Sequence, residues 1–181
     1  MDRSRRKTPH AASPTATVET PPRDSSALTV DIRDLAHDES LALLARHHVG
    51  HVGISFHDIL RVELAAYVYA DDWIYARMEL GDELTTVQHH PWGAFEVDEV
   101  ESIYDWRSVE VRGAVQFLSS DSHGRDWFEF ANAVRLIREV VPQVLTADDP
   151  LPQRSQVVRL HIDDIRGRVS RSSAPTTLPR P

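Results

Sequence analysis

The chain has 181 residues, of which 41% are hydrophobic and 27% charged, and its formal net charge is −8. This length predicts one domain of ordinary globular composition, and no apolar run approaches the roughly 18 residues of a membrane span. The absence of cysteine excludes disulfides, thiolate nucleophiles and cysteine-based metal sites. The basic start MDRSRRKTPH is not followed by an apolar core, so we expect no secretory signal and a cytoplasmic location.

Charge and composition set the two ends of the chain apart from its middle. Residues 1–27 hold five Lys/Arg against three Asp/Glu, and residues 168–181 hold three Arg and no acid, which leaves a net charge of −13 between them. Such an acidic surface repels phosphate backbones, so nucleic-acid binding by the folded part is disfavoured. The Pro-, Ser- and Thr-rich segments 1–27 and 171–181 are predicted to be disordered tails of a domain spanning 28–170.

The first half of this domain predicts a helix and then a strand hairpin. Acidic residues precede a helical spacing of leucines at about 38–47, and period-2 alternation follows at 49–56. A clearer strand pattern follows at 61–70, and Asp71-Asp72 is predicted to form a turn that connects it to a short strand at 73–76. The two strands together are predicted to form a hairpin.

The second half mixes two further helices with longer strands. A helix is predicted at 82–90 and strands at 92–100 and 106–118, with Gly113 marking a bulge or a close backbone approach in the second strand. Asp121-Ser122 is expected to cap a helix at 123–140, and Pro142 to end it. The apolar face of this helix is Trp127, Phe130, Ala131, Val134, Ile137 and Val141. A last strand at 156–170 gives six strands, which predicts an α+β antiparallel barrel.

Three segments in this order carry a family resemblance: YVYADDWIY, HHPWGAFEVDEV and WRSVEVRGAV. Together they resemble the FMN-binding split barrel of the pyridoxamine 5′-phosphate oxidase superfamily, especially its nitroimidazole-resistance-like and general-stress-like branches. The resemblance covers residues 38–170. It implies an α+β fold with a six-stranded antiparallel split β-barrel and flanking helices, and a homodimer with two flavin sites at the subunit interface.

The resemblance also implies where a flavin would bind. The strand after the Asp-Asp turn offers the ring its backbone groups, which points to Ala76, Arg77, Met78 and Glu79. Arg61 is a candidate cation for the phosphate, and a further segment near the cofactor, commonly reached from the partner subunit, is Trp106, Arg107 and Ser108. As separate residues, Arg77 equally suits an ion pair and Met78 suits core packing.

Two positions depart from the family pattern. Glu83 stands where a phosphate-binding Lys is usual, and Glu63-Leu64 replaces a Val-Pro pair. A carboxylate near a phosphate is repulsive, although Arg61, Arg77 and Arg107 are available to compensate.

Three functions follow as hypotheses. The first is an FMN-dependent oxidoreductase acting on a small-molecule substrate that the sequence does not identify, in which the ring does the chemistry and no side chain need be a catalytic acid. The second is a protein of the same fold that binds haem, deazaflavin or another flat cofactor, motivated by ten histidines. The third is a cofactor-free dimer. The histidines lack HExxH or Cys/His spacing, so no metal site is predicted.

Overall fold

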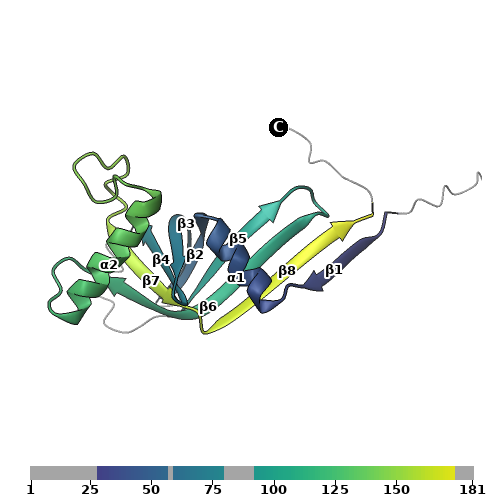
Figure 1. The fold of residues 1–181 in the computed structure, drawn as a ribbon, viewed down its shortest axis with the longest axis horizontal. Coiled ribbons are helices and arrows are strands. Elements are labelled where there is room, and N and C mark those ends of the chain that lie inside the picture. Colours follow the sequence, from purple (N-terminus) through teal and green to yellow (C-terminus); the bar gives the residue numbers. More distant parts are fainter. Residues whose placement is uncertain (1–27, 57–58, 80–91, 174–181) are drawn as a thin grey trace, which may run out of the picture.

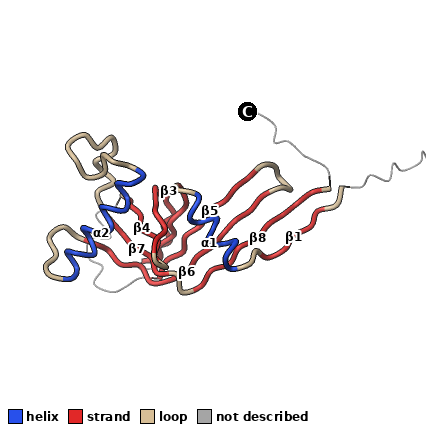
Figure 2. Tube along the Cα trace, in the orientation of Figure 1, coloured by secondary structure: helices blue, strands red, loops and turns tan. Residues whose placement is uncertain are grey.

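The structure is a computed structural model that describes residues 28–56, 59–79 and 92–173. Eight strands and two helices make up this part of the chain (Figures 1 and 2). The strands are β1 (Val30–Asp34), β2 (Val49–Phe56), β3 (Ile59–Ala70), β4 (Trp73–Met78), β5 (Trp92–Val100), β6 (Trp106–Leu118), β7 (Gln156–His161) and β8 (Asp164–Ser172). The helices are α1 (His37–Arg46) and α2 (Arg125–Val140).

Six of the strands close into an antiparallel barrel. The sheet order is β1-β8-β6-β5-β2-β3-β4-β7, and an additional pairing between β6 and β7 joins its two parts. Strands β8 and β1 extend from the outer half of β6 as a ribbon that projects beyond the barrel (Figure 1). The predicted α+β split barrel with flanking helices is confirmed.

Strand β6 belongs to both parts of the sheet because it changes partner halfway. It pairs with β8 up to Arg112 and with β7 from Val115 onward. Gly113 lies at this corner, where an added Cβ would be 1.8 Å from the carbonyl oxygen of His161. The predicted close backbone approach at Gly113 is therefore confirmed, since only a residue without a side chain fits there.

Strands β2 to β7 supply the buried side chains of the barrel core. Tyr67 and Phe95 are its largest fully buried side chains, and their rings meet edge to face with centroids 4.6 Å apart. The Tyr67 hydroxyl donates a 2.8 Å hydrogen bond to the carbonyl oxygen of Leu44 in α1. The helix thus covers one end of the barrel, with Leu43 and Leu44 buried against it.

Helix α2 packs across β3, β4, β6 and β7 and forms a second, smaller core. Its buried residues are Ala133, Val134 and Ile137, and Phe130 and Val141 pack partly buried against the same core, so four of the six residues of the predicted face are confirmed, while Ala133 was not predicted. Trp127 is 45% exposed, so its assignment to that face is wrong. The helix begins after Gly124, which has φ 61° and makes no side-chain cap, so the predicted Asp121-Ser122 cap is also wrong.

Two features of the sheet were not predicted from the sequence. The predicted strand 156–170 is divided into two strands, β7 and β8, which run along β6 in the same direction as each other and are separated by a break at Ile162 and Asp163, beside the corner of β6. Strand β1 was not predicted, since its five residues are all exposed and lack a buried alternating pattern. The hairpin turn at Asp71 and Asp72 is confirmed, both residues having positive φ as type I′ turns require.

Candidate functional site

The barrel opens along one edge of β4, in the segment that the resemblance assigns to a flavin ring. Strand β4 pairs with β3 only as far as Ala76, opposite Tyr67, but continues with β7 as far as Met78. Beyond Ala76, no strand among the described residues pairs with the β3 side of β4. Backbone groups of residues 77–79 are therefore the ones that a ligand at this opening would meet.

Glu63 reaches across this opening from β3. Its Oε1 accepts a 3.1 Å hydrogen bond from the backbone N–H of Glu79 and lies 3.8 Å from the Arg154 guanidinium. Arg154 in turn donates a 2.7 Å hydrogen bond to the carbonyl oxygen of Leu64. The Glu63 carboxylate thus accepts the hydrogen bond of one backbone N–H donor, that of Glu79, and the Arg154 guanidinium lies beside it. Arg154 was missed because it lies in a loop, 91 residues from Glu63 and without a motif.

Arg61 lies on the same face of β3 as Glu63, two residues nearer the start of the strand. Its side chain is exposed, and it pairs across the sheet with Ile54. Arg61 and Arg154 are therefore the cations that β3 and the loop before β7 bring to this opening. Glu83 and the predicted helix at 82–90 lie outside the described residues.

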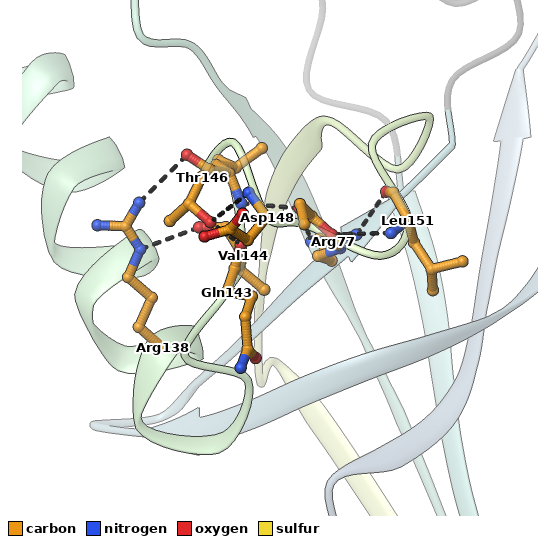
Figure 3. Close-up of polar contacts among 9 residues, drawn as sticks. Arg77, Arg138, Gln143, Val144, Thr146, Asp148 and Leu151 are labelled. Carbon is orange, nitrogen blue, oxygen red and sulfur yellow. Dashed lines mark hydrogen bonds and ion pairs between the residues drawn. The ribbon is translucent and has the colours of Figure 1, made fainter.

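The Arg77 side chain is directed away from the opening and into an ion pair with the loop before β7 (Figure 3). It donates two hydrogen bonds to the Asp149 carboxylate, at 2.6 and 3.0 Å, and one of 2.6 Å to the carbonyl oxygen of Leu151. Both charged side chains are almost fully buried, at 5% and 3% exposure. The ion-paired interpretation of Arg77 is the one that the structure supports, and its guanidinium is not available to a ligand.

Asp149 is the centre of this loop. Besides Arg77, the backbone N–H groups of Leu145 and Leu151 donate to it, at 2.8 and 2.9 Å. The Arg77 guanidinium holds the pKa of Asp149 well below its ordinary value, and these N–H donors add to the effect. Arg138 of α2 ties the other end of the loop by donating to the carbonyl oxygens of Val144 and Leu145 (Figure 3).

Ala76 and Met78 face the barrel interior, where they are 1% and 0% exposed. Their side chains belong to the core, as the packing interpretation of Met78 predicts. Glu79 is exposed. Of the four residues 76–79, only the backbone and the Glu79 side chain are therefore placed to contact a ligand.

The triplet Trp106-Arg107-Ser108 is divided between two faces of the sheet by strand alternation. Trp106 pairs with Val100 on one side and with Ser170 on the other, and Ser170 pairs with Ile32. This row lies on the face away from α1, with Val100 and Ile32 more than half exposed. Ser108 shares that face.

Arg107 points the other way, toward α1, where it lines a cavity together with Leu43 and Arg46. Its guanidinium lies 3.8 Å from Glu99. Glu99 also accepts hydrogen bonds from Arg46, at 2.5 Å, and His47, at 2.7 Å. The structure therefore places Arg107 in a different environment from Trp106 and Ser108, and it brings neither group near residues 76–79 within one chain.

The described residues hold neither a cluster of metal ligands nor a membrane-spanning helix. Within residues 28–56, 59–79 and 92–173, no three His, Asp or Glu side chains converge in a way that would hold a metal ion. Over the same residues, neither helix has the length and apolar character needed to cross a bilayer.

A flavin ring fits these residues better than its phosphate does. The unpaired edge of β4 supplies backbone groups for a ring, and Arg61 and Arg154 are the cations at the opening. Glu63 is an anion in the same place, and Arg77 is already paired. The site is thus defined by backbone groups and two arginines, with one carboxylate opposing a phosphate.

The fold is that of a six-stranded antiparallel split β-barrel with flanking helices. The family model for pyridoxamine 5′-phosphate oxidase matches residues 36–169, and the chain belongs to this family. No curated protein matches the chain.

Several solved structures have the same fold. A FAD-binding protein from Mesorhizobium loti has a TM-score of 0.58 and 22% identity, covering 79% of this chain and 99% of that one. A protein described as a 5-nitroimidazole antibiotic resistance protein from Bacteroides thetaiotaomicron has a TM-score of 0.55 and 16% identity, covering 80% and 92%. A FAD and heme binding protein from Mycobacterium smegmatis has a TM-score of 0.52 and 14% identity, covering 75% and 71%. At these identities the likeness establishes the fold.

Proposed function

We propose that this protein binds a flavin along the open edge of β4 and acts as a flavin-dependent oxidoreductase. The observation that carries the proposal is the end of β3–β4 pairing at Ala76, which leaves the β3 side of residues 77–79 without a strand partner in the described chain. Family membership and the FAD-binding proteins of the same fold support it. When bound, the flavin supplies the hydride and electron transfer, while the protein supplies orientation and electrostatics.

FMN is the flavin that we propose first, although the similar solved structures named for a flavin are FAD-binding. Arg61 and Arg154 would hold the phosphate, because guanidinium groups can grip phosphate oxygens through two hydrogen bonds. The negative charge of Glu63 repels the phosphate. The phosphate of FMN is therefore expected to add only modestly to the affinity, compared with riboflavin, which has no phosphate. Haem or a deazaflavin remains the second candidate, favoured by the haem-binding protein among the similar structures.

Glu63→Gln tests where the phosphate lies. The amide keeps an acceptor for the Glu79 N–H but removes the charge, so FMN should bind a few-fold more tightly, by about 1 kcal/mol, with riboflavin unaffected. Equilibrium titration with each flavin, followed by flavin fluorescence, measures both. Glu139→Gln, which removes an exposed helix carboxylate, is the matched control. Equal effects of Glu63→Gln on FMN and riboflavin would contradict the placement of the phosphate beside Glu63.

We also propose that the protein is a homodimer that buries an apolar surface of the barrel. This surface consists of the outward side chains of β3 and the start of β5: Leu60, Val62, Leu64 and Trp92, which are 49–71% exposed. Strand β2 lies between them and presents His51 opposite Leu64, Gly53 opposite Val62 and Ser55 opposite Leu60. Exposed large apolar side chains gathered on one face are typical of a protein interface.

A further inference from the structure

A second potential ligand site, separate from the edge of β4, lies where α1 covers the ribbon formed by β1, β8 and β6. A cavity of about 240 Å³ lies there, partly open to solvent. Its apolar lining includes Val169 and Leu43, which are 4% and 2% exposed, and Leu35. Four arginines from four different elements also line it: Arg33 of β1, Arg46 of α1, Arg107 of β6 and Arg171 of β8.

The strand register explains why these side chains meet. Val169 pairs with Arg33 on one side and with Arg107 on the other, so the three side chains lie in one row on one face. Arg171 lies two residues further along β8 and therefore on the same face. The arginines are thus placed around an apolar base by the backbone itself.

Two of these guanidinium groups have donors to spare. Arg107 and Arg171 contact Glu99 and Glu101 only at 3.8 and 3.6 Å, beyond hydrogen-bonding distance. Neither side chain makes a closer polar contact to any described residue. The Glu99 carboxylate accepts hydrogen bonds from Arg46 and His47. Its contact with the Arg107 guanidinium is longer, at 3.8 Å.

The charge of the lining is positive within an acidic domain. Four arginines face two carboxylates, those of Asp31 and Glu39, and Glu39 is held by Arg33 through hydrogen bonds of 3.1 and 3.3 Å. The hydrogen-bonded ion pair with Arg33 lowers the pKa of Glu39 to about 2. The Glu39 carboxylate therefore stays ionised and keeps the Arg33 guanidinium occupied. The lining residues themselves thus hold four arginines against two carboxylates, and Glu99 and Glu101 contact Arg46, Arg107 and Arg171 from outside the lining.

We propose that this cavity binds a small organic dianion, a dicarboxylate of four or five carbons. Guanidinium groups bind carboxylates through paired hydrogen bonds, and Arg107 and Arg171 both have N–H donors without a hydrogen-bond partner, which suits a ligand with two carboxylates. The apolar base favours a ligand with a short hydrocarbon body over inorganic phosphate. The cavity is smaller than the roughly 300–1,000 Å³ of drug-sized pockets, which limits the ligand to a few carbons. This site does not depend on flavin binding.

Isothermal titration of the full chain in low-chloride buffer tests the proposal with three probes: succinate, glutarate and inorganic phosphate. Succinate or glutarate should bind with one site per chain and more tightly than phosphate. Arg171→Gln should weaken that binding by about tenfold or more, as the loss of a charge-assisted hydrogen bond predicts. Arg166→Gln is the matched control, because Arg166 lies on the same strand with its side chain on the opposite face.

Three results would overturn the proposal. The first is the absence of binding by both dicarboxylates at millimolar concentration. The second is an Arg171→Gln variant that binds as the Arg166→Gln variant does, while circular dichroism shows both to be folded. The third is tighter binding of phosphate than of either dicarboxylate, which would assign the cavity to a different anion.

Discussion

Replacing Asp149 by Ala is expected to lower the free energy of unfolding by about 3–5 kcal/mol, the usual cost of removing one partner of a buried ion pair. The variant would leave the Arg77 guanidinium buried at 5% exposure without its counter-ion. It would also orphan the backbone N–H groups of Leu145 and Leu151, which donate to the same carboxylate. Urea denaturation followed by circular dichroism measures the change.

The control for this variant is Asp148→Ala. Asp148 is the exposed neighbour, so its replacement should change stability by no more than about 0.5 kcal/mol. Because the pKa of Asp149 is lowered in the folded protein, its stabilising effect is present above the unfolded value of about 4 and is lost as the pH falls below it. Equal stabilities of the two variants at neutral pH would show that the Arg77–Asp149 pair does not hold the loop.

Val62→Glu is expected to convert the proposed dimer into monomers. A two-fold interface contains the same residue twice, so the substitution places two carboxylates on an apolar surface with no described cation opposite Val62. Burying them costs several kcal/mol, which weakens dimerisation by about a hundredfold or more. Size-exclusion chromatography with light scattering over a concentration series measures the mass.

Phe128→Glu provides the comparison, because Phe128 is 68% exposed on α2 and outside the proposed interface. Its mass should equal that of the unmodified protein, and both variants should keep the unmodified melting profile of the barrel. A Val62→Glu variant that remains dimeric, or an unmodified protein that is monomeric at every concentration, would contradict the proposed surface.

Much of the barrel could be predicted because its strands alternate clearly. The pattern places Phe95 and Val97 on one side of β5, and Val109 and Val111 on one side of β6, and all four are buried. The Asp71-Asp72 turn was recognisable because few other dipeptides accept positive φ twice. Strand β1 could not be recognised, since it is held by backbone pairing to β8 rather than by burial of its own side chains.

The candidate site was less predictable than the fold. The segment 76–79 and the replacement of the usual pair by Glu63-Leu64 were visible in the sequence, and the structure brings Glu63 to Glu79. The partners Arg154 and Asp149 were not visible, because each is fixed by tertiary contacts over more than 70 residues. The separation of Arg107 from Trp106 follows from strand alternation, but which face α1 covers is decided only by packing.

The most direct measurement of flavin binding is the visible absorbance spectrum of the freshly purified full chain, followed by titration with FMN, FAD and haem. We expect either the absorption bands of a bound flavin on purification or saturable binding of FMN or FAD with one site per chain. A colourless protein that binds neither flavin would contradict the proposed function. A Soret band on haem addition, in a protein that binds neither FMN nor FAD, would show that the barrel binds haem instead of a flavin.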